Sequence, residues 1–252
     1  MFEGKLATLG GLVAAAVLGV SAPACAQPLF RNFSACGGES RGAANPSVAR
    51  YVASVGGRSF TFDRSAAAPD ALLKFDDDSE VWVLEASPAP GGGKIYRNDA
   101  GDRVLQVTCL GGLTLYVNKP EGDPVAILGD AEELLPPPVT APDAMLLRAV
   151  QAAARAGRAS QHQITFTTSQ MPPQATPIFL ESFSIAADAI VKLSRQKQAK
   201  PFLAKLDTVQ FLIGPRPDVS LNGSTMIVTL TPAKGFAGRP SSNRIMKTCL
   251  KR

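Results

Sequence analysis

A proline-rich run near the middle of the chain divides the sequence into two parts with different patterns. Residues 135–142 read Leu-Pro-Pro-Pro-Val-Thr-Ala-Pro, so four prolines fall within seven positions. Proline fixes φ and donates no backbone hydrogen bond, and such a run favours a stiff, extended spacer. Before it, short apolar runs alternate with turn residues; after it, apolar residues recur at helical spacing. The sequence predicts a β-rich lobe at 50–135, a linker at 136–142 and a second lobe at 143–252.

The part before the linker has the pattern of a β-meander. A glycine closes short polar loops such as Asn98-Asp99-Ala100-Gly101, and short connections favour antiparallel pairing. Residues 27–49 are rich in Gly, Ser, Ala and Asn and are expected to form a flexible N-terminal arm. The expected strands lie around Tyr51 and Phe60 and at 72–73, 81–84, 94–97, 104–108 and 113–117.

The part after the linker predicts a lobe of two main helices and a small antiparallel sheet. A first helix begins near Asp143, with Leu146, Ala149, Val150 and Ala153 as its expected apolar face. A second helix is expected from about Leu180 to Gln198. Strands are expected at 163–168, 209–213 and 226–230, with a hairpin turn at 222–223 and a final short helix capped by Ser241 or Ser242. The predicted fold class is α+β, with the β-meander lobe packed on this second lobe.

The first 26 residues are predicted to be a cleavable signal peptide. Lys5 precedes an apolar run from Leu6 to Val20, which is too short to span a hydrocarbon core of ~30 Å. A small residue at Ala26 suits cleavage before Gln27. We therefore expect a periplasmic or secreted mature chain without a transmembrane helix.

The cysteines support a prediction about disulfide bonds. Cleavage removes Cys25, unless that residue carries a lipid, which is the alternative interpretation. Export favours disulfides, but the three remaining cysteines are an odd number. Cys109 follows Leu105 and Val107 at period two, which predicts a buried free thiol on the same apolar face. A bridge between Cys36 and Cys249 is then the expected pairing, although the sequence does not determine connectivity.

Charge is distributed unevenly between the two parts. Residues 27–135 hold 10 Lys/Arg against 15 Asp/Glu, and residues 136–252 hold 15 against 5. The two parts are expected to attract each other and pack together. The alternative is that the basic part meets an anionic envelope component or an acidic protein. A nucleic-acid partner is not expected, because no RNP pattern, zinc-finger spacing or interleaved aromatic residues are present.

No catalytic, metal-binding or cofactor-binding motif is recognisable in the sequence. His162 is the only histidine and is expected to be a packed or rim residue rather than a catalytic base. Residues 76–80 carry four acids, but they lack the Gly and Glu spacing of a calcium-binding EF-hand loop and predict a solvated turn. Residues 194–197 match the S-x-x-K motif of serine acyl-transferases, but Ser194 lies near the exposed end of its predicted helix.

One loop near the C-terminus is a candidate anion-binding site. Gly238, Arg239, Ser241 and Ser242 combine a glycine-rich backbone, a guanidinium group and the start of a capped helix. Free backbone N–H groups and the helix dipole favour anions at such a place. The competing interpretation is that Arg239 pairs with a carboxylate of the acidic part.

Four stretches of the chain, which lie in both parts, carry a resemblance to a known family. They are Glu80-Val81-Trp82-Val83-Leu84, Ile95-Tyr96-Arg97-Asn98-Asp99, Leu110-Gly111-Gly112-Leu113-Thr114 and Gly238-Arg239-Pro240-Ser241-Ser242. In these stretches the chain resembles a family of exported alphaproteobacterial proteins catalogued as a domain of unknown function. The resemblance implies an exported protein whose two parts belong together, and it implies no activity, cofactor or catalytic residue.

We expect a non-catalytic binding or accessory module of the envelope. The alternatives are a hydrolase of an envelope polymer and a binder of anionic lipid or polymer.

Overall fold

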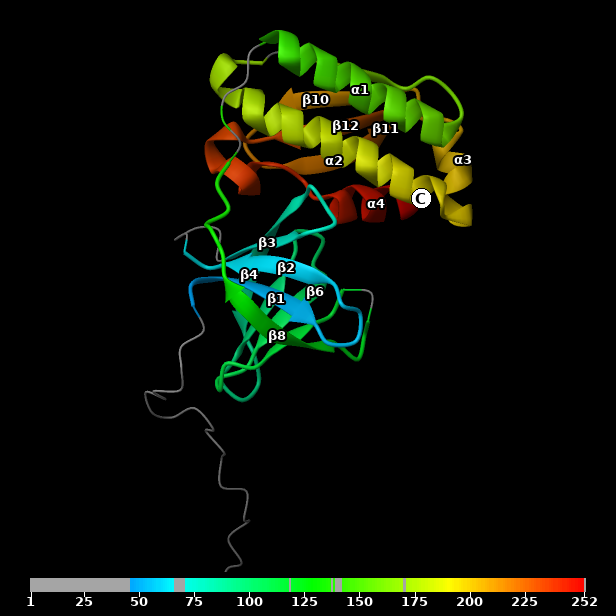
Figure 1. Ribbon diagram of the computed structural model, residues 1–252. Coiled ribbons are helices and arrows are strands. Elements are labelled where there is room, and N and C mark those ends of the chain that lie inside the picture. The colour runs from blue at the N-terminus through cyan, green and yellow to red at the C-terminus, as the bar shows by residue number, and fades with distance from the viewer. Residues whose placement is uncertain are drawn as a thin grey trace, which may run out of the picture. The chain divides into compact units, whose positions relative to one another are not determined.

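Eight antiparallel strands form a closed barrel in the first part of the protein. The computed structural model describes residues 46–65, 71–117, 119–136, 138, 142–169 and 171–251. Each strand pairs with the next along the chain, and β8 pairs with β1 to close the barrel. Figure 1 shows the barrel in blue to green. Its strands are β1 (Val48–Ala53), β2 (Ser59–Asp63), β3 (Ala71–Phe75), β4 (Val81–Pro88), β5 (Lys94–Arg97), β6 (Arg103–Val107), β7 (Leu113–Leu115) and β8 (Asp123–Asp130).

Aromatic side chains from five consecutive strands fill the barrel interior. Alternate residues of a strand point to the same face, so Phe60 and Phe62 both point inward from β2. Phe75 stacks edge-on against Trp82, with ring centroids 5.6 Å apart, and Phe62 meets Tyr96 in the same way at 5.1 Å. The interior is therefore a packed core of large rings rather than an open channel.

The up-and-down strand order places four connections at one end of the barrel. The connections β1–β2, β3–β4, β5–β6 and β7–β8 all lie at this end, which we call the β3–β4 end. Asp123 holds two of them together, because its carboxylate accepts the N–H groups of Val55 at 3.0 Å and Gly56 at 3.1 Å. Lys119 adds an ammonium group 3.0 Å from the same carboxylate.

The second part contains all the described helices and a four-stranded sheet. The helices are α1 (Pro142–Ser160), α2 (Thr176–Ser194), α3 (Lys200–Leu203) and α4 (Ser242–Leu250), with short 3-10 segments η1 (Pro173–Ala175), η2 (Lys197–Ala199) and η3 (Pro232–Gly238). The strands are β9 (Thr165–Thr168), β10 (Thr208–Ile213), β11 (Asp218–Asn222) and β12 (Thr225–Leu230). Figure 1 shows α1 and α2 side by side along the sheet. The α+β class predicted from the sequence is confirmed.

The small sheet is mixed, whereas the sequence predicted an antiparallel one. Its order is β11–β12–β10–β9, and β10 runs parallel to both β12 and β9. The long connection from β9 to β10 passes through α2, which allows a parallel pair. Only the β11–β12 hairpin is antiparallel, and its turn has Gly223 at φ +59°, as the Asn-Gly signal predicted.

Helix α1 buries a different face from the one the sequence predicted. Ala152 and Ala156 are buried, and Ala149 is half-buried, whereas Leu146 is 64% exposed and Val150 57% exposed. Small side chains let α1 approach α2, whose buried face is also rich in alanine. Close helix packing therefore selects the alanine stripe of α1 rather than its larger apolar residues.

The final helix begins as predicted. The Ser241 hydroxyl oxygen accepts the N–H of Arg244 at 3.1 Å, which makes Ser241 the N-cap of α4. None of the described helices combines the length and apolarity needed to cross a bilayer. The predicted signal peptide at 1–26 and most of the predicted arm lie outside the described residues; the rest of the arm, 46–49, includes the start of β1.

Candidate functional site

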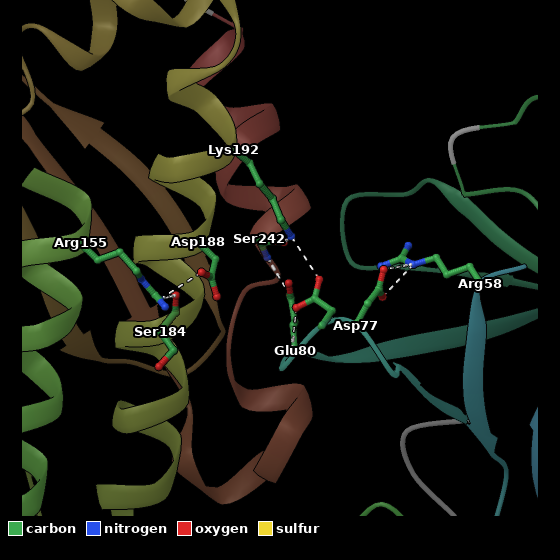
Figure 2. Close-up of polar contacts among 9 residues, drawn as sticks. Arg58, Asp77, Glu80, Arg155, Ser184, Asp188, Lys192 and Ser242 are labelled. Carbon is green, nitrogen blue, oxygen red and sulfur yellow. Dashed lines mark hydrogen bonds and ion pairs between the residues drawn. The ribbon is translucent and has the colours of Figure 1, made fainter. Parts of the chain in front are cut away.

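Two carboxylates of the barrel bind the start of helix α4. The N–H of Ser242 donates to Glu80 at 2.8 Å, and the N–H of Ser241 donates to Asp99 at 2.9 Å. The Ser241 hydroxyl donates to the second oxygen of Asp99. Anions suit this position because the first N–H groups of a helix lack partners within the helix. Figure 2 shows Glu80 beside Ser242. We call this contact region between the barrel and the second part the junction.

Arg239 joins three elements at the junction. Its side chain is buried, its Nε donates to Glu181 of α2 at 2.7 Å, and its Nη2 donates to the carbonyl of Val81 in β4 at 3.0 Å. The carboxylate partner therefore comes from the second part, and the acidic barrel contributes a carbonyl group. Gly238 permits this chain path, because a Cβ there would lie 2.0 Å from the carbonyl oxygen of Thr231.

The candidate anion loop is thus occupied from within the protein. Ser241 and Ser242 bind Asp99 and Glu80, and Arg239 binds Glu181. Internal carboxylates stand where the loop was a candidate to bind an external anion, and Arg239 pairs with a carboxylate of its own part rather than with one of the acidic part. The physical reason is that the acidic β3–β4 and β5–β6 connections fold directly against this helix start.

Ion pairs extend the junction on its outer side. Lys192 of α2 places its ammonium group 3.4 Å from Asp78 and 3.4 Å from the Ser242 hydroxyl. Figure 2 shows the Lys192 side chain reaching from α2 toward Ser242. Lys247 of α4 lies 3.1 Å from Asp102. These contacts pair basic residues of the second part with acidic residues of the barrel. Some of the opposite charges of the two parts therefore form ion pairs across the junction.

Burial shifts the pKa values of two acidic side chains at or beside the junction. Burial raises the pKa of Glu80, although the bonds from Ser242 and the charges of Arg239 and Lys192 oppose that shift. Burial also raises the pKa of Asp188, and the nearby charge of Arg155 opposes it. Figure 2 shows the Arg155–Asp188 ion pair between α1 and α2.

A cavity of about 380 Å³ lies at the β3–β4 end of the barrel, beside the junction. Every one of the four connections at this end, or a strand terminus next to it, contributes to its wall, and α2 and α4 supply the rest. This volume is within the range of small-molecule sites. The lining residues are Arg58, Asp78, Trp82, Asn98, Asp102, Arg103, Val104, Tyr116, Val117, Lys192, Asn243 and Met246.

Three residues that line this cavity each hold an N–H donor that is enclosed by protein atoms and has no hydrogen-bond partner among the described residues. The donors are Nε1 of Trp82, Nδ2 of Asn98 and Nε of Arg103. The Trp82 side chain is buried at 6% exposure and Asn98 at 5%. The Asn98 Oδ1 atom accepts the N–H groups of Ala100 at 3.1 Å and Asp102 at 2.8 Å, which fixes the orientation of the amide group. Buried donors without acceptors are costly and uncommon in folded proteins.

The cavity also carries one positive charge without a matching carboxylate. Of the charged lining residues, Arg58 pairs with Asp77, Lys192 pairs with Asp78, and Asp102 pairs with Lys247. Arg103 forms no salt bridge with any described residue. Its guanidinium group lies 3.6 Å from the ring centre of Tyr116 and donates to the hydroxyl of Tyr116 at 2.6 Å and to Gln106.

The local sequence does not indicate Trp82, Asn98 or Arg103 as site residues. Its pattern predicts a turn at Asn98 and a strand at Trp82, and the family resemblance of both stretches implies no site residue. The available signal was an asparagine opening a hairpin loop, whose side-chain oxygen caps the turn and leaves its NH₂ group to point elsewhere. Nothing in the local sequence indicates that Asn98 and Trp82 line one cavity.

The residues considered for catalysis or metal binding have structural partners. The ring nitrogens of His162 contact the carbonyl oxygens of Leu206 at 2.7 Å and Ser160 at 3.2 Å. The Ser194 hydroxyl donates to the carbonyl of Val191 at 2.9 Å. In the acidic run 76–80 each carboxylate has a separate partner, and the described residues contain no cluster of acids, His or Cys suited to a metal ion.

The predicted Cys36–Cys249 bridge is wrong. Cys249 is a free, buried cysteine in α4, where it packs in the core of the second part. Cys109 is disulfide-bonded, whereas the sequence predicted a free thiol there. The reason is that β6 ends at Val107, so Cys109 lies half-buried in the following turn and does not continue the inward alternation. Its partner lies outside the described residues, as does Cys36.

Comparison with known proteins gives a family match and no further relative. A family model described as a domain of unknown function (DUF4908) matches residues 30–249. No curated protein matches the chain significantly. No solved structure matches it either.

Proposed function

Because the chain belongs to the DUF4908 family, which is defined by a domain of unknown function, we propose its role from the geometry of the site. We propose that the protein is an exported, non-catalytic binding module that holds a small molecule in the cavity at the β3–β4 end. The observation that carries this proposal is the cavity itself, whose wall includes Arg103, a cation that forms no salt bridge with any described residue. A polar small molecule would find both a positive charge and an apolar wall there.

The placement of the cavity supports a binding role. Its wall comes from the ends of the barrel strands, which the aromatic core holds rigidly, and from two helices of the second part. A site built on rigid elements keeps donors in position at little entropic cost when a ligand binds. The Glu80 and Asp99 contacts hold α4 beside the cavity, which keeps Asn243 and Met246 in its wall.

Two observations support the export and the lack of catalysis. The disulfide bond at Cys109 suits an oxidising compartment, in agreement with the predicted signal peptide. The single histidine contacts backbone carbonyls, and Asp78 and Asp102, which line the cavity, pair with lysines. An acid or base for general catalysis would need a free position facing a bound molecule.

Ligand binding can be tested with the only tryptophan of the chain. The indole N–H of Trp82 gives a single resonance in a nitrogen-15 NMR spectrum of the mature protein. We expect the small-molecule fraction of an envelope extract, below about 1 kDa, to shift this resonance in a saturable way, because volumes near 300–1,000 Å³ hold ligands of that size. Absence of any shift at saturating extract would refute the binding role.

A matched pair of variants locates the binding. Val117→Phe adds volume to the cavity wall and is expected to abolish the shift, because Val117 lines the cavity. Val55→Phe makes the same change in the β1–β2 turn of the same end, at a residue 75% exposed that does not line the cavity. We expect Val55→Phe to behave as the wild type. A shift that survives Val117→Phe would place binding elsewhere.

The two alternatives from the sequence predict other outcomes. A polymer hydrolase would release soluble fragments from purified envelope polymer, and a binder of anionic surfaces would sediment with anionic vesicles only at low salt. Either result, combined with an unchanged indole resonance, would replace the proposal.

A further inference from the structure

We propose that the groove between α1 and the edge strand β9 binds an extended, acidic segment of a partner protein, which adds a fifth strand to the small sheet. This groove shares no lining residue with the cavity at the β3–β4 end, so the two sites are independent of each other. Three features of the surface point to such a partner: an open sheet edge, an apolar groove beside it, and the charge of the groove wall.

Strand β9 leaves one edge of the small sheet open. Among the described strands it pairs only with β10. The N–H of Thr165 donates to the carbonyl of Asp207 at 2.9 Å, so the backbone of Thr165 faces β10. Because backbone direction alternates along a strand, the N–H and C=O of Phe166 point toward the open edge. β9 carries no charge, proline or bulge, which are the usual protections of an edge strand, so a further strand can pair with it.

An apolar groove of about 670 Å³ lies beside this edge. Leu146 and Val150 line it from α1, and Ile164 and Phe166 line it from the β9 side. The two α1 side chains stay exposed because α1 packs on α2 through its alanine stripe. A strand added to β9 would turn every second side chain toward α1, and apolar side chains at those positions would cover Leu146 and Val150.

The length of the groove suits a short extended segment. Leu146 and Arg158 both line it from α1. At 1.5 Å of rise per helical residue they lie about 18 Å apart along the helix axis, which is about the length of five or six residues of extended chain.

The charge of the groove wall favours an acidic partner. Arg158 lines the groove, and none of its described lining residues is acidic. Arg158 forms no salt bridge with any described residue, so a carboxylate of the added strand would be its first charged partner in this part of the protein. A second copy of the chain fits less well, because pairing of β9 with its own counterpart would bring together two walls that each hold an arginine and no acid.

The test uses two fluorescent seven-residue peptides and the full mature protein. In the first peptide, glutamate stands at both ends, valine at the inner odd positions and threonine at the even positions; the second has lysine at both ends. By fluorescence anisotropy we expect the glutamate peptide to bind about tenfold more tightly, because the lysine peptide replaces attraction to Arg158 by repulsion. Saturating glutamate peptide is expected to slow hydrogen exchange of the Phe166 amide, because strand pairing protects that N–H. Equal affinity for the two peptides, or unchanged exchange, would overturn the proposal.

Two matched pairs of variants in α1 locate the binding. Val150→Asn replaces an apolar side chain of the groove wall and is expected to weaken binding at least about tenfold, whereas Leu147→Asn changes a residue that is 58% exposed and does not line the groove. Arg158→Glu is expected to reverse the order, so that the lysine peptide binds more tightly. Arg148→Glu, which is exposed on α1 outside the groove, is expected to keep the wild-type order. Wild-type binding by a folded Val150→Asn protein would contradict the site.

Two measurements on the free protein would reveal a different occupant. Sedimentation is expected to give a monomer. A dimer that Val150→Asn dissociates and Leu147→Asn does not would mean that a second copy fills the groove and that the acidic partner is wrong. Strong protection of the Phe166 amide in the free monomer would mean that the chain covers its own sheet edge, with the same consequence.

Discussion

At the scale of single residues, the contribution of Glu80 to stability is expected to depend on pH. Glu80 is the most buried acid of the run 76–80. One oxygen accepts the N–H of Ser242, and the other has no partner among the described residues. A buried carboxylate with one free oxygen is disfavoured in its ionised form. Glu80 therefore orients α4 at an electrostatic cost that depends on its protonation.

The substitution Glu80→Gln isolates that cost. Burial raises the pKa of Glu80 in the folded chain, so the stability that comes from its protonated form is present below about pH 4.3 and is lost as pH rises through the folded value. We expect the stability of the wild type relative to Glu80→Gln to increase as pH falls from 7 to 4.5, by at most about 1.4 kcal/mol for each pH unit. Urea unfolding at several pH values measures it.

The control for this experiment is Glu85→Gln, which removes an exposed carboxylate from the same strand. A difference between wild type and Glu80→Gln that stays constant over this pH range would show that Glu80 titrates alike in the folded and unfolded chains.

The two described cysteines should differ in reactivity. Burial raises the pKa of the Cys249 thiol to about 12, so almost no thiolate forms at pH 8. Iodoacetamide is expected to modify Cys249 only after unfolding, and Cys109 only after reduction. Peptide mass spectrometry checks both, and the peptide linked to Cys109 identifies its partner. Rapid labelling of Cys249 in the native protein would contradict its burial.

At the scale of elements, helix α1 shows how packing selects a face. The alanine stripe at Ala152 and Ala156 contacts the core, and the larger Leu146 and Val150 lie on the exposed side. The apolar groove there, about 670 Å³ between α1 and β9, is lined by both of these residues. Hydrophobicity alone chose a neighbouring face, which shares the half-buried Ala149 with the observed one.

Matched substitutions in α1 test this orientation. Leu146→Lys and Val150→Lys should change the free energy of unfolding by no more than about 0.5 kcal/mol, because both side chains are exposed. Ala156→Leu should destabilise the protein by about 1–3 kcal/mol, because it adds volume to a packed contact. Denaturant unfolding followed at 222 nm provides the measurement. A larger loss for Leu146→Lys than for Ala156→Leu would mean that the predicted face was right.

At the scale of the whole molecule, the junction couples the barrel to the second part. Arg239, Ser241 and Ser242 reach barrel groups, and Phe236 packs on Leu72 and Val81 of the outer barrel surface. Hydrogen bonds in a partly buried, apolar environment are stronger than exposed ion pairs and are less sensitive to salt. The two parts are therefore expected to unfold together.

Removal of the Glu80 and Asp99 carboxylates should uncouple the unfolding of the barrel from the unfolding of the second part. In Glu80→Ala/Asp99→Ala the first N–H groups of α4 lose their acceptors. Fluorescence of Trp82 follows the barrel, and circular dichroism at 222 nm follows the described helices, all of which come after the linker. The two melting curves should coincide in the wild type and separate by more than about 5 °C in the double variant.

The control removes two carboxylates whose ion pairs do not cross the junction. In Asp77→Ala/Asp218→Ala the lost ion pairs are Arg58–Asp77 within the barrel and Arg244–Asp218 within the second part. The two curves should still coincide. Separation of equal size in this control would mean that general charge loss, rather than the junction, decouples the parts.

The sequence by itself determined the elements whose signals are local. Period-two runs and short glycine-containing loops placed the barrel strands β1 to β7 but not β8, Asn222-Gly223 placed a hairpin, and Ser241 placed a helix cap. These signals depend only on neighbouring residues and on backbone conformation, so they can be recognised without knowledge of the tertiary structure. The tertiary structure decided whatever depends on distant residues: the closure of the barrel, the parallel pairs of the small sheet and the pairing state of Cys109 and Cys249. It also decided that Glu80 and Asp99 fill the candidate anion loop, and that Trp82, Asn98 and Arg103 share one cavity, because those contacts join residues that only the folded chain brings together.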